Sequence, residues 1–161
     1  MIDIVCFEDK ELDKFGKKLG FSRVYNINEL NVKFVKNEIE IRKSVDRKNK
    51  VDIIIGVELV SKKDSFHQRN SGLNQIICKL AKENKVAIGF SFSNVLNSKK
   101  RALILGRMMQ NVKLCRKYKV KIICGSFAKN KKEMRDAKDL LSFCRVIGMD
   151  PGEAKKALNY K

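Results

Sequence analysis

The segment 69–92 constrains the fold more than any other part of the sequence, because it joins a polar loop, an amphipathic helix and an uncharged strand. Its apolar residues recur at the helical period, at Leu73, Ile76, Ile77, Leu80 and Ala81. This spacing predicts a helix over 71–84 with one buried face, capped by Ser71. The run 86–92 lacks charge, as in a strand covered on both faces. A helix that leads into such a strand through a short turn is one unit of an α/β fold.

The same alternation continues on both sides of this segment. We expect the other strands at 2–7, 21–25, 32–35, 51–57 and 120–124, and the other helices at 8–19, 99–117, 132–147 and 150–159. Ser98 and Asp150 are the expected N-caps of two of these helices, and Glu153 completes a capping box with Asp150. Residues 38–42 alternate polar and apolar, which favours a half-covered strand over the alternative of a short helix. The polar residues 44–50 are expected to form a loop with one helical turn.

This alternation predicts one domain over residues 1–161, with parallel strands joined by right-handed crossovers. A barrel is one arrangement that satisfies the pattern. An eight-unit barrel takes about 200 residues or more. Any barrel formed by this chain would therefore be contracted or incomplete.

Net charge is the strongest global signal for function. The chain carries 36 Lys and Arg against 18 Asp and Glu, a formal charge of +18, which favours a polyanion such as RNA or DNA and, second, an anionic membrane surface. Glu133 is the only acid between Val95 and Arg135. Aromatic residues are few and Trp is absent, so recognition of folded RNA by its backbone and shape is favoured over base stacking. No apolar run is long enough to span a membrane, and the N-terminus lacks signal-peptide features, so we expect a cytoplasmic protein.

Catalytic and metal-binding patterns are weak by comparison. His67 is the only histidine; one His cannot form a multi-histidine metal site, and a surface role is expected. The carboxylates Asp3, Asp52 and Glu58 lie near strand ends and could serve metal or acid–base chemistry, but nothing in their spacing shows that they converge. No phosphate-loop, dinucleotide-binding or nucleophile motif occurs. The five cysteines are expected to be reduced and mostly buried, and no catalytic or metal-binding residue is assigned.

Basic side chains remain as the candidate site. Arg69 precedes the predicted helix 71–84, Arg101 and Arg107 lie on the long helix, and Lys129 and Arg135 flank the loop 125–130. Wound at 100° per residue, Lys100, Arg107 and Asn111 form one polar stripe along the long helix. If these residues share one end of the sheet, they form a positive platform for phosphates. We expect Arg107→Ala to flatten the salt dependence of RNA binding by about one unit.

Several motifs follow one another from Arg42 onward: RKSVDRK (42–48), VDIIIGVE (51–58), RNSGLNQIICKLAKENKVAIGFSF (69–92), RALILGRMMQNVKLCRKYKVKIICGSFAKN (101–130) and MRDAKDLLSFCRVIGMDPGEA (134–154). Together they resemble the archaeal and eukaryotic ribonuclease P protein component 3 family, the thirty-kilodalton subunit. Residues 1–41 resemble the family only in general character. The chain is also shorter than expected for the family in its N-terminal half.

This resemblance implies a TIM-barrel-like fold and a non-catalytic subunit of the ribonucleoprotein that removes the 5′ leader from precursor tRNA. It implies catalysis by the RNA with magnesium, no cofactor bound by this chain, and no membrane partner. The implied partners are ribonuclease P RNA, ribonuclease P protein component 2 in a heterotetramer, and precursor tRNA in the holoenzyme. Two other hypotheses stay open: a metal-dependent phosphoesterase on a similar barrel, which the solitary His disfavours, and a free-standing RNA-binding protein.

Matching positions carry over five residues as RNA contacts: Lys43, Arg69, Arg101, Arg107 and Lys129. Lys100 and Arg135, from the same basic region, complete the predicted RNA-binding set.

Overall fold

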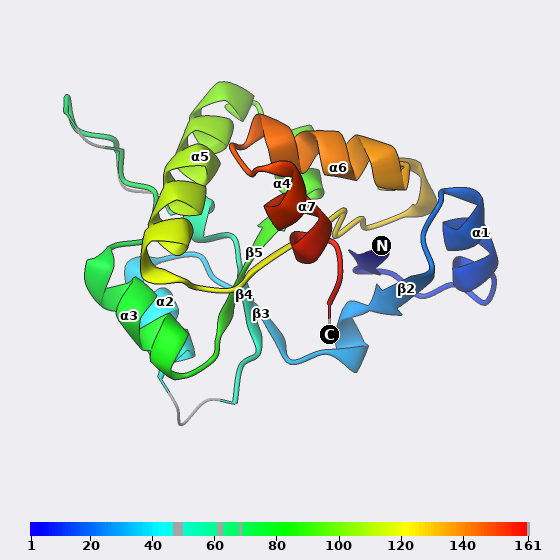
Figure 1. Cartoon of the computed structure of the whole chain (residues 1–161), viewed down its shortest axis with the longest axis horizontal. Helices are drawn as coiled ribbons and strands as arrows, with labels where there is room; N and C mark the ends of the chain where they lie inside the picture. Colours follow the sequence, from blue (N-terminus) through cyan, green and yellow to red (C-terminus); the bar gives the residue numbers. More distant parts are fainter. Residues whose placement is uncertain (47–49, 61–62, 68, 161) are drawn as a thin grey trace.

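Six parallel strands alternate with helices around a curved sheet (Figure 1). The structure is a computed structural model that describes the chain except residues 47–49, 61–62, 68 and 161. The strands are β1 (Ile2–Val5), β2 (Arg23–Asn26), β3 (Val32–Phe34), β4 (Ile53–Ile55), β5 (Ala87–Ser91) and β6 (Ile122–Gly125). β1 pairs with β2, while β3, β4, β5 and β6 pair in that order.

Backbone hydrogen bonds just after β6 connect the two groups of strands. The Phe127 amide donates to the Ile4 carbonyl, and the Cys6 amide donates to the Ala128 carbonyl, both at 2.8 Å. The strands are therefore arranged in the order β2-β1-β6-β5-β4-β3. No pairing joins β2 to β3 among the described residues, so this is the arrangement of a barrel that is open between these two strands. The predicted α/β fold with parallel strands is confirmed, and the described strands form an open, barrel-like sheet.

Alternate residues along the strands build two apolar layers, as the period of two requires. The inner layer, enclosed by the curved sheet, consists of Ile4, Ile53, Ile55, Ala87, Ile123 and Phe127. Gly89 belongs to this crowded interior, because a β-carbon there would lie 2.8 Å from Ile55 Cγ1. Residues of opposite orientation, such as Ile54, Ile88 and Phe90, pack in the larger core beneath the helices.

Helices cover the outside of the sheet (Figure 1). They are α1 (Leu12–Lys18), α2 (Glu38–Val45), α3 (Gln75–Glu83), α4 (Phe92–Leu96), α5 (Arg101–Tyr118), α6 (Ala137–Val146) and α7 (Pro151–Ala157). The connections of the described chain contain the single 3-10 turns η1 (Ile27–Glu29), η3 (Val57–Leu59) and η4 (Lys131–Glu133). No helix in the described part of the chain is both long enough and apolar enough to cross a bilayer.

The strand predicted at 38–42 is wrong: this segment forms α2. The Asn37 side chain accepts a hydrogen bond from the Glu40 amide at 2.9 Å and caps the helix, while Ile41 and Val45 turn inward. A side-chain cap and an inward face at i and i+4 outweigh the polar–apolar alternation. The loop predicted at 44–50 is a helix as far as Val45, and residues 47–49 lie outside the described residues.

Helix α3 begins later than predicted. Asn74 caps it, because its Oδ1 atom accepts from the Ile77 amide at 2.9 Å. Ser71 lies before the turn at Gly72, whose φ of +84° suits glycine. The predicted apolar stripe is only partly buried: Ile76 is 61% exposed and Leu80 37% exposed. The capping box at Asp150 and Glu153 is confirmed.

Candidate nucleic-acid interface

The segments that follow β5 and β6 meet at the carboxyl end of the sheet. α4 begins directly after β5, and the loop 126–135 follows β6. Glu133 joins them: its carboxylate accepts hydrogen bonds from the Ser93 hydroxyl at 2.8 Å and the Asn97 amide group at 3.2 Å. It also accepts from the Lys129 backbone amide at 3.0 Å. One carboxylate thus holds α4 and the loop after β6 together.

Four of the predicted RNA-binding residues surround α4. Lys100 and Arg101 lie where α5 begins, and an Arg101 Nη2 atom donates to the Leu96 carbonyl at 2.9 Å. The Arg135 guanidinium lies 5.6 Å from the centre of the Phe92 ring, a cation–π contact at the other end of α4. We call Lys100, Arg101, Lys129 and Arg135 the α4 platform. Arg135 is half-buried and the other three are exposed, so the platform presents cations to solvent.

Acids do little to cancel this charge. Hydrogen bonds, first from the Lys129 backbone and then from Ser93 and Asn97, lower the pKa of Glu133. Glu133 therefore stays ionised and is already bonded inside the platform. Nearby, Lys131 forms an ion pair with Asp9 at 2.7 Å. The four platform cations remain in excess, which suits contact with phosphate groups.

Arg107 was predicted to contact RNA, but it is only 4% exposed. Its guanidinium donates to both the Glu58 and Val60 carbonyls, at 3.1 and 2.7 Å. It also forms an ion pair with Asp64 at 2.7 Å. The structure corrects the prediction: Arg107 anchors the segment after β4 and has no surface to offer a phosphate.

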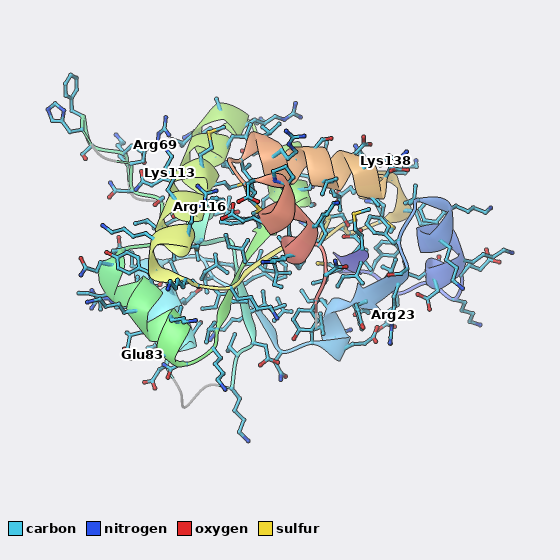
Figure 2. The ribbon with its side chains drawn as sticks, in the orientation of Figure 1. Arg23, Arg69, Glu83, Lys113, Arg116 and Lys138 are labelled. Carbon is cyan, nitrogen blue, oxygen red and sulfur yellow. The ribbon has the colours of Figure 1, made fainter. Side chains whose placement is uncertain are left out.

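Asn111 of the predicted polar stripe has a similar anchoring role, together with Gln110 and Arg69, whereas Lys100 of that stripe is exposed in the α4 platform. Gln110 donates to the Arg69 carbonyl at 3.1 Å, and Asn111 donates to the Ser71 carbonyl at 2.8 Å. In return, Arg69 donates from Nη1 to the Gly106 carbonyl at 3.0 Å. These bonds hold the connection between β4 and α3 along the flank of α5. Arg69 is exposed there (Figure 2), away from α4.

Lys43 lies at the opposite end of the sheet. It belongs to the last turn of α2, and the carbonyl of Val45 in that turn accepts from the Asn84 side chain at 2.6 Å. Asn84 ends α3 just before β5 begins. Lys43 is therefore near the amino ends of the strands, whereas the α4 platform is at the carboxyl ends.

The candidate carboxylates do not converge. Asp3 accepts from the amide and hydroxyl of Ser126, both at 2.6 Å, and Glu58 accepts from the Asn94 side chain at 2.9 Å. Burial raises the pKa of each carboxyl to about 6. Asp52 precedes β4 and Glu58 follows it, so these two lie at opposite ends of the strand. Each carboxylate is held by its own structural neighbours.

His67 and the cysteines are not arranged as a metal site in the described residues. The His67 ring lies 4.7 Å from the Phe66 ring, in a segment that projects from the body of the protein (Figure 1). All five cysteines are free thiols and four are buried, as predicted. Across the described ranges, no three His, Cys, Asp or Glu side chains gather as a metal site would require.

Sequence reasoning missed a group of lysines at the amino end of the sheet. Lys85 and Lys119 occupy equivalent places, at the turns that lead from α3 into β5 and from α5 into β6, and line one groove with Lys121. The signal was present in the sequence, because a lysine stands immediately before each of the predicted strands 86–92 and 120–124. Residues at equivalent turns of successive units meet at one end of a parallel sheet.

Comparison with known proteins identifies relatives. The family model described as RNase P subunit p30 matches residues 47–161. Ribonuclease P protein component 3 of Methanosarcina mazei is 37% identical over 93 residues, covering 56% of this chain and 39% of that protein. That of Methanococcus maripaludis strain C5 is 32% identical over 123 residues, covering 75% and 50%. The chain thus spans half or less of the length of these two relatives.

Solved structures share the fold. A chain of the cryo-EM structure of archaeal ribonuclease P with mature tRNA superposes with a TM-score of 0.77 at 22% identity, covering 98% of this chain and 87% of that one. A crystal structure of an uncharacterized protein gives a TM-score of 0.52 at 14% identity, covering 78% and 31%. Because the family model matches well over half of the sequence, the chain belongs to the RNase P subunit p30 family.

Proposed function

We propose that this chain is a protein subunit of ribonuclease P that binds the catalytic RNA and supports removal of the 5′ leader from precursor tRNA. Family membership over residues 47–161 is the observation that carries the proposal. The relatives that match in sequence are named ribonuclease P protein component 3. The charge of +18 supports an RNA partner independently of the family.

The α4 platform is the proposed RNA-binding surface. Lysine and arginine neutralise phosphates and release counterions, which gives affinity without reading base sequence. Arg101 and Arg135 are held by contacts to Leu96 and Phe92, so their guanidinium groups lose less conformational freedom when they bind. The platform therefore positions RNA by its backbone.

In this proposal the RNA performs the chemistry with magnesium, the chain itself is non-catalytic, and the complex works in the cytoplasm. The engagement of Asp3 and Glu58 in separate structural contacts supports a non-catalytic role. Asp3 is bonded to Ser126 and Glu58 to Asn94 of α4, so the two carboxylates are held by different residues and do not form a shared acid–base pair. A metal-dependent phosphoesterase is the less favoured alternative.

Ribonuclease P protein component 2 is the proposed protein partner, in a heterotetramer. Helices α2 and α3 lie side by side (Figure 1) and expose large apolar side chains: Ile39 is 66% and Ile76 61% exposed. Solvent exposure of such residues on neighbouring helices suits a protein interface. We assign this α2–α3 surface to the protein subunit and the α4 platform to RNA.

Reconstitution tests the proposal. Ribonuclease P RNA and the other protein components would be assayed for precursor-tRNA cleavage at limiting magnesium, with and without this chain. We expect cleavage to require the RNA and to rise at least tenfold when the chain is added. Unchanged cleavage, with RNA binding retained, would indicate a free-standing RNA-binding protein. Hydrolysis of phosphoesters by the purified chain with added metal would support the phosphoesterase instead.

A further inference from the structure

Among the described residues, a groove of about 820 Å³ lies at the amino ends of β5 and β6, beside the C-terminal ends of α3, α5 and α7. Six cationic residues line it: Lys82, Lys85, Arg116, Lys119, Lys121 and Lys156. Its single acid is Glu153. We call this hollow the basic groove.

The negative charge of Glu153 is neutralised by an ion pair with Arg116 inside the groove. Arg116 Nε and Nη2 lie 2.7 and 2.6 Å from the two carboxylate oxygens of Glu153. Figure 2 shows Arg116 on the side of α5 that faces α7. These bonds lower the pKa of Glu153 to about 2, so the pair persists at neutral pH. Lys82, Lys85, Lys119 and Lys156 therefore add positive charge to the rim, where Glu153 is the one acid among the described residues.

Two of these lysines occupy unusual backbone positions. Lys85 has a φ of 58° and Lys119 a φ of 55°, in the left-handed region where glycine commonly ends a helix. Lys50, which leads into β4, has a φ of 42°. A non-glycine residue in this region is strained, because its β-carbon crowds the backbone. Cations for the helix dipoles are already supplied within the last turns by Lys82 and Arg116. Lysine is present at these turns although glycine would fit them without strain. This indicates that the ammonium groups have a binding role.

The basic groove and the α4 platform lie at opposite ends of the strands. β5 has five residues, which span about 16 Å at roughly 3.3 Å per residue. One phosphate group therefore cannot contact both surfaces. Lys43, which was predicted to bind RNA but lies away from the platform, is at the same end as the groove.

We propose that the basic groove binds the phosphodiester backbone of a second RNA segment, so that the chain bridges two segments of RNA. The inference rests on the proposed function, because it extends RNA binding to a second surface. An acidic peptide is the competing ligand. Lysines from α7 and from the turns after α3 and α5 surround the groove, and such a spread of cations suits the repeating charge of a phosphodiester backbone.

The test uses the full chain and 24-base-pair RNA duplexes. The groove variant carries Lys85→Gln, Lys119→Gln and Lys156→Gln; the matched platform variant carries Lys100→Gln, Arg101→Gln and Lys129→Gln. We expect each variant to lower the magnitude of the salt slope of binding by about three. Wild-type protein on an immobilised duplex should capture a second, labelled duplex, and either variant should lose this capture at least tenfold.

Two further variants separate binding from folding. Lys85→Gly and Lys119→Gly should raise the melting temperature, because they relieve the left-handed strain, and yet weaken RNA binding. A groove variant that keeps both the wild-type salt slope and the capture, beside a platform variant that loses them, overturns this inference and leaves the proposed function standing. A groove variant that loses only the binding of a poly-glutamate peptide assigns the groove to a protein and also overturns it. If wild-type protein binds no duplex, the proposed function fails as well.

Discussion

The Arg107 guanidinium on α5 holds a single oxygen of Asp64, with Nε 3.0 Å and Nη2 2.7 Å from Oδ1. Two further bonds run from the same group to the carbonyls of Glu58 and Val60. The arginine side chain is 5% exposed, and that of Asp64 is 21% exposed. The segment after β4 is therefore fixed to α5 by a nearly buried charge, and this has consequences for stability.

We expect Arg107→Ala to lower the free energy of unfolding by about 3 kcal/mol, because it removes a donor from two carbonyl groups and the cation that pairs with Asp64. The salt slope of RNA binding should not change. Arg101→Ala on the same helix is the matched control: exposed, it should cost about 0.5 kcal/mol or less and should flatten the slope by about one unit. Urea denaturation and RNA titrations at several salt concentrations measure both quantities. The reverse pattern would return Arg107 to the RNA-binding surface.

Glu58→Gln should stabilise the protein at neutral pH. Burial raises the Glu58 pKa from its ordinary value of 4.5 to about 6, so between these values the folded state binds more protons than the unfolded state. The free energy of unfolding therefore falls as pH rises through this window. Glutamine has no charge to bury and can still accept from Asn94. The difference between the pKa values of 4.5 and about 6 corresponds to roughly 2 kcal/mol, which sets the expected gain in the free energy of unfolding at pH 7.

The control for this prediction is the same comparison at pH 4, below both pKa values, where the carboxyl is mostly protonated in both states and the two proteins should differ least in stability. Asp3, whose pKa is also raised to about 6, contributes to the pH dependence of both proteins and cancels in the difference. A stability difference that stays constant from pH 4 to pH 7 would show that Glu58 is not forced to ionise in a buried site.

Ile76→Lys on α3 should weaken association with ribonuclease P protein component 2 at least tenfold, because a charge replaces a 61% exposed apolar side chain at the proposed interface. Stability should change by about 0.5 kcal/mol or less, since the side chain is not part of the core. Co-purification and titration calorimetry with component 2 measure the effect. Val146→Lys on α6, where the side chain is 57% exposed, is the matched control and should bind normally. Equal loss in both variants would remove the α2–α3 surface from the interface.

The fold was predictable because its signals are local. Uncharged runs such as 86–92 and the capping box at Asp150 are read from neighbouring residues, and both are confirmed. The segment 38–42 was misread because one turn of amphipathic helix and a short half-buried strand give similar alternation. The decisive feature was the Asn37 cap, which a period alone does not reveal.

The candidate site was predictable only in part. Lys100, Arg101, Lys129 and Arg135 meet around α4 because they follow or flank the carboxyl ends of adjacent strands. The burial of Arg107 could not be predicted, because its partners come from carbonyl groups more than 40 residues away. A polar stripe on a helix looks the same whether it faces a ligand or holds a loop of its own chain.

The most direct measurement of the central claim is reconstituted precursor-tRNA cleavage at limiting magnesium, comparing wild-type protein with the variant carrying Lys100→Gln, Arg101→Gln and Lys129→Gln. The account predicts that wild-type protein stimulates cleavage and that the variant, with unchanged stability, loses at least tenfold of that stimulation, recovering as salt is lowered. Full stimulation by the variant at every salt concentration would contradict the assignment of the α4 platform as the surface that binds ribonuclease P RNA.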